Sequence, residues 1–162
     1  MMDQMLLQVL MGSLGSLGYA VLFNVRRSAL LFSVLGGALG WAVYLLTGGV
    51  YPDDLANYLY AAMAVTLYAE VLARVKKTPV TVFLVTSIIP LIPGGSLYYT
   101  MASCLREDIA DFSTRGIYTI SIAAMIALGI MAVMMLMHVY LSIRCSIRAR
   151  RRRMSDGRDM PR

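Results

Sequence analysis

The sequence predicts an all-α integral membrane protein with five transmembrane helices, and two observations support that fold class. Of its 162 residues, 59% are hydrophobic and only 15% are charged, with a mean hydropathy of +0.68. Soluble domains carry about a quarter charged residues, so this chain cannot cover a soluble core with polar surface. The apolar residues also gather in five stretches of at least 19 residues, and about 20 residues are needed to cross a bilayer as a helix.

The predicted spans follow one another with short charged loops between them. The first three hold 19 residues each, the fourth holds 26 and the fifth holds 25, at residues 5–23, 29–47, 55–73, 80–105 and 117–141. None of them shows the strict alternation of a membrane β-strand, which favours helices. We expect residues 1–143 to form one five-span membrane domain and residues 144–162 to form a basic cytoplasmic tail.

The charges of the loops alternate in sign and predict the orientation of the chain. Basic residues follow the first, third and fifth spans, whereas acidic residues predominate after the second and the fourth. Cytoplasmic loops carry an excess of Lys and Arg, so five crossings with the N-terminus outside put 13 of the 15 basic residues inside. The Arg-rich tail is then a topology anchor and a contact with membrane lipids, and we expect no nucleic-acid partner.

The fourth span carries a break in its helical pattern. Pro90 and Pro93 each remove a backbone hydrogen bond, and Gly94 and Gly95 then lack the side chains that favour a helix. Pro90 lies ten residues past Val80, about 15 Å into a core of about 30 Å, so we expect the break near the bilayer midplane. Unwound backbone at that depth is tolerated only when it is buried in protein or lines a polar cavity.

The residues after the break suit the binding of a carboxylate. A second half-helix that starts near Ser96 would direct its free N–H groups and its positive dipole end toward the cavity. This pattern predicts substrate contacts at Pro90, Pro93, Gly94, Gly95, Ser96, Tyr98 and Tyr99. The alternative is a proline kink that only shapes helix packing. Two prolines followed by a Gly-Gly pair favour the substrate site.

One ionisable pair lies inside the predicted spans. Glu70 is the only carboxylate within a span, which makes it a candidate proton carrier. Arg74 follows four residues later, in the order that favours an ion pair on a helix. We favour the structural ion pair and keep the proton role as the alternative.

Metal and enzyme chemistry find little support in the sequence. Met131, Met134 and His138 share one face of the fifth span and would suit copper(I), but 13 methionines in the chain favour a packing role. Cys104 and Cys145 lie far apart, without the spacing of a zinc site or a disulfide framework. No catalytic motif is present. We therefore expect no metal, no cofactor and no enzymatic activity.

Small residues mark the predicted packing faces. The GxxxG spacing from Gly36 to Gly40 allows helix backbones to approach closely. This spacing leaves open whether the contact forms within one chain or between the subunits of a higher oligomer.

Three stretches of the sequence resemble a known transporter family. They are residues 18–27 (GYAVLFNVRR), 35–41 (LGGALGW) and 89–99 (IPLIPGGSLYY), and the last is the most specific. They are similar to the threonine/serine exporter family, and in particular to its small YjjB-like subunit, which corresponds to the C-terminal half of the fused exporters.

The resemblance implies a secondary exporter in the bacterial inner membrane. Its substrate would be a small carboxylate-bearing metabolite, either threonine and serine or a dicarboxylate such as succinate. In split members a larger subunit supplies five further spans and a soluble part, so the resemblance implies that this chain is half of a transporter. Two other functions stay open from the sequence: a non-transporting structural or assembly protein, and a channel formed by a homo-oligomer.

Overall fold

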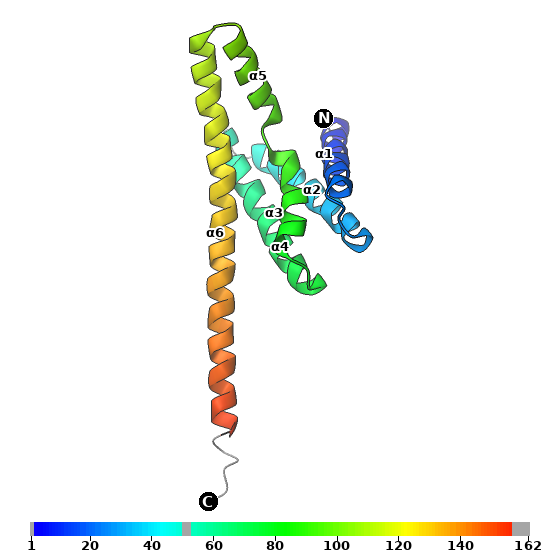
Figure 1. Ribbon diagram of the computed structural model, residues 1–162, viewed down its shortest axis with the longest axis vertical. Coiled ribbons are helices and arrows are strands. Elements are labelled where there is room, and N and C mark those ends of the chain that lie inside the picture. The colour runs from blue at the N-terminus through cyan, green and yellow to red at the C-terminus, as the bar shows by residue number, and fades with distance from the viewer. Residues whose placement is uncertain (1, 50–52, 157–162) are drawn as a thin grey trace, which may run out of the picture.

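The computed structural model of the chain describes residues 2–49 and 53–156 (Figure 1). Within these residues the fold is all-α, which confirms the predicted fold class. The elements are α1 (Met2–Leu22), α2 (Arg27–Gly48), α3 (Asp54–Lys76), α4 (Val80–Ile88), the 3₁₀ turn η1 (Ile89–Leu91), α5 (Gly94–Leu105) and α6 (Ile109–Asp156). Four helices (α1, α2, α3 and α6) are long and apolar enough to cross a membrane, and the bent pair of α4–η1 with α5 is the fifth candidate span.

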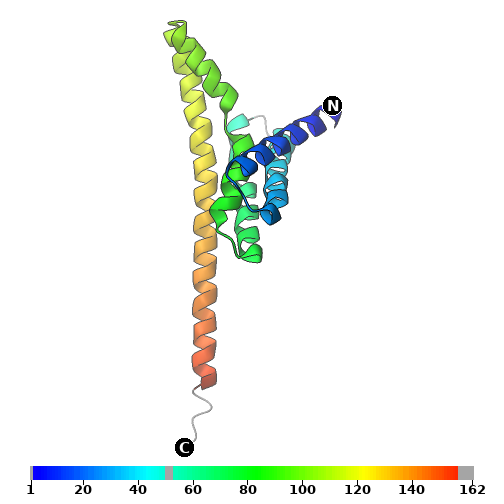
Figure 2. The same ribbon diagram turned by 45° about the vertical axis from the view of Figure 1, so that its right-hand side comes forward.

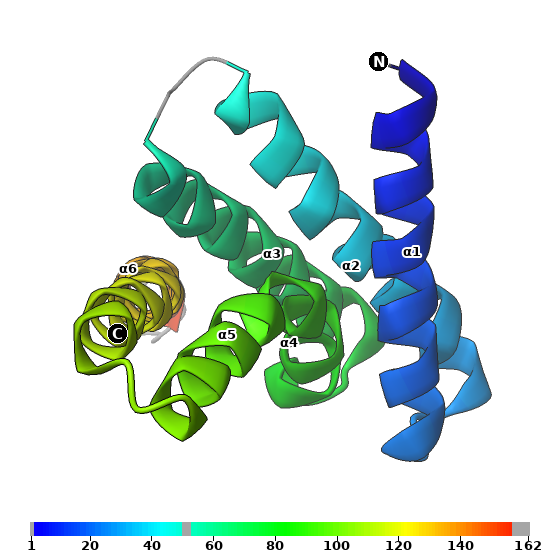
Figure 3. The ribbon, with the colours of Figure 1, turned by 90° about the horizontal axis from the view of Figure 1, so that it is seen from above.

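Helix α3 lies at the centre of the bundle. It packs against α2, α4 and α6, and α2 packs in turn against α1 and α4. Seen from above, α6 lies on one side of α3 and α1 lies beyond α2 on the other side (Figure 3). The core between these helices is built from small and branched side chains and one phenylalanine: Ala61, Ala62, Val65, Ala69, Phe83, Leu91, Ile122 and Ile126.

Two glycines let α2 approach its neighbours closely. A methyl group on Gly36 would overlap the Oγ of Ser87 in α4 and lie 2.8 Å from its Cβ. A methyl group on Gly37 would likewise overlap the Oγ of Ser16 in α1 and lie 2.7 Å from its Cβ. The predicted close packing at this stretch is therefore made with other helices of the same chain.

Three helix ends share one local geometry. Asn24, Lys77 and Glu107 have φ values of 51°, 52° and 58°, in the left-handed region. In each case the N–H of the next residue donates to a carbonyl five residues earlier, at 2.9 to 3.2 Å, as in a Schellman motif. These closures end α1, α3 and α5 abruptly, so short loops return the chain along the neighbouring helix.

Helix α6 is longer than the sequence predicts. It begins at Ile109 instead of residue 117 and holds 48 residues, about 72 Å of helix. The early start has a local cause, because the Asp108 carboxylate accepts a hydrogen bond from the N–H of Asp111 at 3.1 Å. The late end follows because hydropathy marks only the part suited to lipid, whereas Arg is also a good helix former in water. Of the predicted tail, residues 157–162 lie outside the described residues.

Helix α5 contacts only α6 among the described elements. Thr100 Oγ1 lies 3.3 Å from Thr119 Oγ1, and the Ser103 hydroxyl donates to the Asp111 carboxylate at 2.6 Å. This helix pair projects beyond the other helices (Figures 1 and 2). One face of α5 is therefore left without a neighbour in the described part of the chain.

Candidate functional site

The fourth span is broken where the prolines and glycines predict it. The α-helix α4 ends at Ile88, a single 3₁₀ turn follows, and Ile92 is extended with φ −64° and ψ 127°. Helix α5 starts at Gly94, two residues before the predicted start at Ser96. The two halves of the span are bent by 56° at this break.

The backbone at the break leaves two N–H groups open. The N–H of Ile92 donates to the Ile89 carbonyl at 3.1 Å, and the N–H of Gly94 donates to the Ile92 carbonyl at 2.7 Å. The first helical bond of α5 runs from Leu97 to the Pro93 carbonyl at 3.0 Å. No acceptor in the described chain is paired with the N–H groups of the next two residues, at positions 95 and 96. An open helix N-terminus of this kind attracts anions.

Contacts of α5 and α6 define the position of the break along the bundle. Thr100 lies beside Thr119, and the hydroxyl of the adjacent Tyr118 donates to the Asp54 carboxylate, at the start of α3, at 3.2 Å. Gly94 precedes Thr100 by six residues, at most about 9 Å along the helix. The break therefore lies within about 9 Å, along the helix, of the level at which Tyr118 meets Asp54.

Pro90 lines an apolar cavity between α1 and α2. The cavity measures about 340 Å³. Within the described residues, the indole N–H of Trp41 is buried without a hydrogen-bond partner, and Gln8 adds a side-chain amide to the wall. The other lining residues are Leu7, Met11, Gly12 and Gly15. This cavity therefore offers few polar groups in an apolar wall.

Tyr98 and Tyr99 line a second cavity, on the predicted outer side. It measures about 320 Å³ and also contains Arg106, Asp111 and Arg115. The Nε of Arg115 donates to the Asp111 carboxylate at 2.7 Å, and its guanidinium lies 5.7 Å from the centre of the Tyr99 ring. Both signs of charge thus meet beside the two tyrosines.

Two of the residues between these cavities, Gly94 and Gly95, face open space. Gly94 and Gly95 are exposed, and a methyl group built on either would meet no atom within 4 Å. Pro93 and Ser96 are half-buried. The seven predicted substrate contacts therefore do not close around one cavity within this chain.

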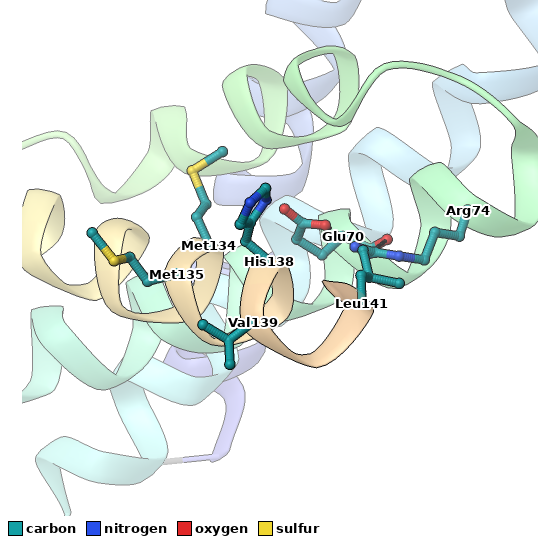
Figure 4. A pocket seen from close by; sticks show the side chains of 7 residues that line it. All are labelled: Glu70, Arg74, Met134, Met135, His138, Val139 and Leu141. Atoms are coloured by element: carbon teal, nitrogen blue, oxygen red, sulfur yellow. Dashed lines mark hydrogen bonds and ion pairs between the residues drawn. The ribbon is translucent and has the colours of Figure 1, made fainter. Parts of the chain in front are cut away.

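A third cavity, of about 430 Å³, lies between α3 and α6 (Figure 4). The Glu70 side chain is only 9% exposed, and its Oε2 lies 2.6 Å from Nη1 of Arg74, which also donates to the Glu70 main-chain carbonyl. His138 lines the cavity from α6 together with Met134. Met131 is 62% exposed and is not among the lining residues, which also include Met135, Val139 and Leu141.

The predicted Glu70–Arg74 ion pair is thus observed within α3. A role of Glu70 in proton transport stays a prediction.

Comparison with known proteins identifies the family. A family model described as "Threonine/Serine exporter, ThrE" matches residues 8–136, which are 129 of the 162 residues. The chain belongs to the threonine/serine exporter family. No solved structure matches this exporter-family chain. Membership in the family, together with the long apolar helices, gives the chain a membrane exporter role.

The family match covers most of the polar features of this threonine/serine exporter homologue. It includes the broken span, the Glu70–Arg74 pair and both tyrosines of the outer cavity. It ends at Leu136, two residues before His138.

Sequence reasoning missed two groups of polar residues in this exporter. His138 is indicated by the sequence only as a candidate soft-metal ligand, whereas it lies across a cavity from Glu70. Helical periodicity does not predict that His138 lies near Glu70, because the periodicity of one helix says nothing about how α3 and α6 are aligned along each other. The ion pair of Asp111 with Arg115 could have been predicted from the sequence, because their spacing of four residues favours an ion pair on one helix.

Proposed function

We propose that this chain is the smaller membrane subunit of a secondary exporter for small carboxylate-bearing metabolites. Threonine and serine, or a dicarboxylate such as succinate, are the substrates we propose. The observation that carries the proposal is the open N-terminus of α5 at the broken span. An ionised carboxylate is costly inside a bilayer unless fixed dipoles replace its water.

The chemistry of the broken span supports reversible binding. Helix α4, the turn η1 and helix α5 contain no Lys or Arg, so this span offers a carboxylate the N–H groups of Gly95 and Ser96, assisted by the hydroxyls of Tyr98 and Tyr99. A helix terminus contributes up to about 2 kcal/mol in a partly buried geometry. Such a weak site suits an exporter, because the substrate must also be released.

The exposure of the break supports a partner subunit. Irregular backbone does not occur in contact with lipid inside the hydrocarbon region, yet Gly94 and Gly95 are exposed in this chain. A protein surface opposite α5 would resolve that conflict and would close the substrate path between two subunits. The partner we propose is a larger five-span subunit of the same exporter family.

The distribution of charge supports the proposed orientation, with the N-terminus outside the bacterial inner membrane and the C-terminus in the cytoplasm. Arg26 precedes α2, Lys76 and Lys77 lie at the end of α3, and all three line one cavity of about 450 Å³. Asp54 meets Tyr118 of α6 at the opposite end of α3. Basic loops on one side and an acidic loop on the other are the pattern of an inside and an outside face.

Efflux from loaded membrane vesicles tests the function directly. Vesicles loaded with labelled threonine or labelled succinate should release the label only when they contain both this chain and the larger subunit. The rate should saturate with substrate concentration. A rate that rises linearly without the larger subunit would indicate a homo-oligomeric channel, and no efflux with both subunits present would indicate a structural protein.

Two leucine substitutions test the position of the site. Gly94→Leu should abolish efflux, because its side chain would project into the space beside the open N–H groups. Gly18→Leu in α1 is the matched control, because this glycine also has open space around it and lies away from the break. Both variants should insert normally. If Gly94→Leu transports as fast as Gly18→Leu, the substrate does not bind at the break.

A further inference from the structure

A basic cavity lies where the turn before α2 meets the turn after α3. It measures about 450 Å³ and is lined by Arg26, which precedes α2, and by Lys76 and Lys77, at the end of α3. The carboxylate site proposed above does not use it. We propose that this basic cavity binds a phosphate group, carried either by an anionic phospholipid headgroup or by free phosphate. The inference does not rest on the proposed exporter function.

No acidic residue in the wall of the basic cavity offsets the three positive charges. The other lining residues are neutral: Phe23, Asn24, Val25, Ala29, Thr78, Pro79 and Val82. The ion pairs of the described residues are Glu70–Arg74 and Asp111–Arg115. Neither involves a basic side chain of this cavity. Because like charges that share one space repel one another, an anion bound among them would be stabilised.

The backbone on both sides of the basic cavity is held in place by the fold. Asn24 and Lys77 have φ values of 51° and 52° and end α1 and α3 with the tight closures described above. The Lys76 ammonium lies 4.3 Å from the centre of the Phe32 ring of α2. This cation–π contact holds the ammonium in position without neutralising its charge. The charges are thus arranged before a ligand binds, which favours affinity.

Two helix N-termini add to the positive charge. Ala29 lies in the first turn of α2 and Val82 in the first turn of α4, and both line the cavity. Neither first turn contains an acidic residue, and neither Arg26 nor Pro79 caps its helix through a side chain. The positive ends of two helix dipoles therefore lie beside the same space as the three basic side chains.

The donors in the basic cavity suit a phosphate group. A guanidinium can donate two parallel hydrogen bonds to phosphate oxygens, and an ammonium binds phosphate as a point charge. Asn24 adds a side-chain amide, whereas the Thr78 hydroxyl already donates to the Lys76 carbonyl at 3.1 Å. A phosphate group presents acceptor oxygens in several directions, which matches cations that come from two separate segments. The volume also falls in the range of ligand pockets, about 300–1,000 Å³.

The level of the basic cavity favours a lipid as the source of the phosphate. Helices α1 and α3 are candidate membrane spans, and they end at Leu22 and Lys76, beside the cavity. Lipid headgroups lie at the level where spans end. Phe23 is 56% exposed and adds an apolar surface to the rim. Basic pockets between transmembrane helices bind anionic headgroups in this way.

The test measures lipid binding to the whole chain, purified in detergent, by native mass spectrometry. The probe is phosphatidylglycerol, and the comparison lipid is phosphatidylcholine with the same acyl chains, whose choline cation neutralises the phosphate. Each basic side chain near a membrane surface strengthens its attraction for anionic lipid by about fivefold. Three such side chains should therefore make phosphatidylglycerol bind more than about tenfold more tightly than phosphatidylcholine.

Substitutions on the two sides of the cavity test its position. Arg26→Gln and Lys77→Gln should each weaken phosphatidylglycerol binding about fivefold, and together about 25-fold. Arg27→Gln is the matched control, because it removes the same charge from the adjacent position, which does not line the cavity. This control should change the affinity less than about twofold. Since Arg26 and Lys77 are exposed, the unfolding temperatures without added lipid should equal that of the wild type.

Inorganic phosphate is the second probe and distinguishes the two sources. If the lipid is the ligand, phosphatidylglycerol should bind with the expected preference, and inorganic phosphate should not raise the unfolding temperature more than chloride at equal ionic strength. If free phosphate is the ligand, it should raise the unfolding temperature of the wild type and of Arg27→Gln, but not that of the double variant. Either outcome supports a phosphate site in the basic cavity.

Two results would overturn the inference. The first is equal binding of the two lipids together with no effect of inorganic phosphate. The second is an equal loss of affinity in Arg26→Gln and Arg27→Gln, because the affinity would then follow the net charge of the chain and not the cavity. Neither result depends on transport, so the proposed function is tested separately.

Discussion

The close contact of α2 with α4 at Gly36 gives a stability prediction with a defined size. Gly36 of α2 faces Ser87 of α4 and Tyr68 of α3, and a methyl group there would lie 2.8 Å from the Ser87 Cβ and 3.0 Å from the Tyr68 Cε1. Neither neighbour can move freely. The Ser87 hydroxyl donates to the Ser33 carbonyl at 3.3 Å, and the Tyr68 hydroxyl donates to the Phe32 carbonyl at 2.9 Å. Gly36→Ala must therefore separate helices or break these bonds.

The expected cost combines three contributions. Overpacking a buried contact costs about 1–3 kcal/mol, and loss of one hydrogen bond adds about 1 kcal/mol. Replacing glycine by alanine within a helix stabilises the folded state by up to about 1 kcal/mol, because alanine has the higher helix propensity. The net loss for Gly36→Ala should thus be about 1–3 kcal/mol, or roughly a 5- to 150-fold change in the folding equilibrium.

Gly18→Ala in α1 is the matched control for this substitution. A methyl group on Gly18 meets no atom within 4 Å, so only the gain in helix propensity remains, up to about 1 kcal/mol. Unfolding of the purified protein in detergent should therefore move in opposite directions for the two variants. Equal stability of Gly36→Ala and Gly18→Ala would show that α2 and α4 are not in close contact.

Four further substitutions test the orientation, the α3–α6 contact and the start of α6. In a background without the native cysteines, Asp53→Cys and Lys76→Cys should react with a membrane-impermeant maleimide from opposite sides; labelling from one side would contradict five crossings. Gly129→Ala should destabilise the protein by about 1–3 kcal/mol, because one neighbour is a main-chain carbonyl; an unchanged unfolding temperature would refute this contact. Asp108→Ala should cost about 1 kcal/mol and speed hydrogen exchange at the start of α6, and unchanged exchange would exclude a capping role.

The sequence predicts the broken span well because the cause of the break is local. Pro90 and Pro93 lack N–H groups wherever the fold places them, and Gly94 and Gly95 follow directly. Its depth depends on how far α5 extends along α6, which is a tertiary property. Its position along the bundle, near the level of Asp54, follows from the pairing of α5 with α6, whereas its depth in the membrane stays a prediction.

The neighbours across helices could not be predicted from the sequence. The Glu70–Arg74 ion pair could be predicted because both residues lie on one helix with a spacing of four. His138 joins them only through the relative register of α3 and α6, which depends on the Gly129 contact. The outer cavity has the same origin, because Tyr99 and Arg115 meet through the pairing of α5 with α6.

The length of α6 has a mechanical consequence. A continuous helix of 48 residues has no proline and no break at which it could bend sharply. It therefore behaves as a stiff lever of about 72 Å, and a tilt of about 10° would move one end by about 12 Å relative to the other. Since α5 packs on the N-terminal part of this lever, a displacement of the half-helix beside the break would be transmitted, enlarged, to the C-terminal end of α6. Spectroscopic probes on the loop before Ile109 and beyond Leu141 would report that motion as a single correlated change.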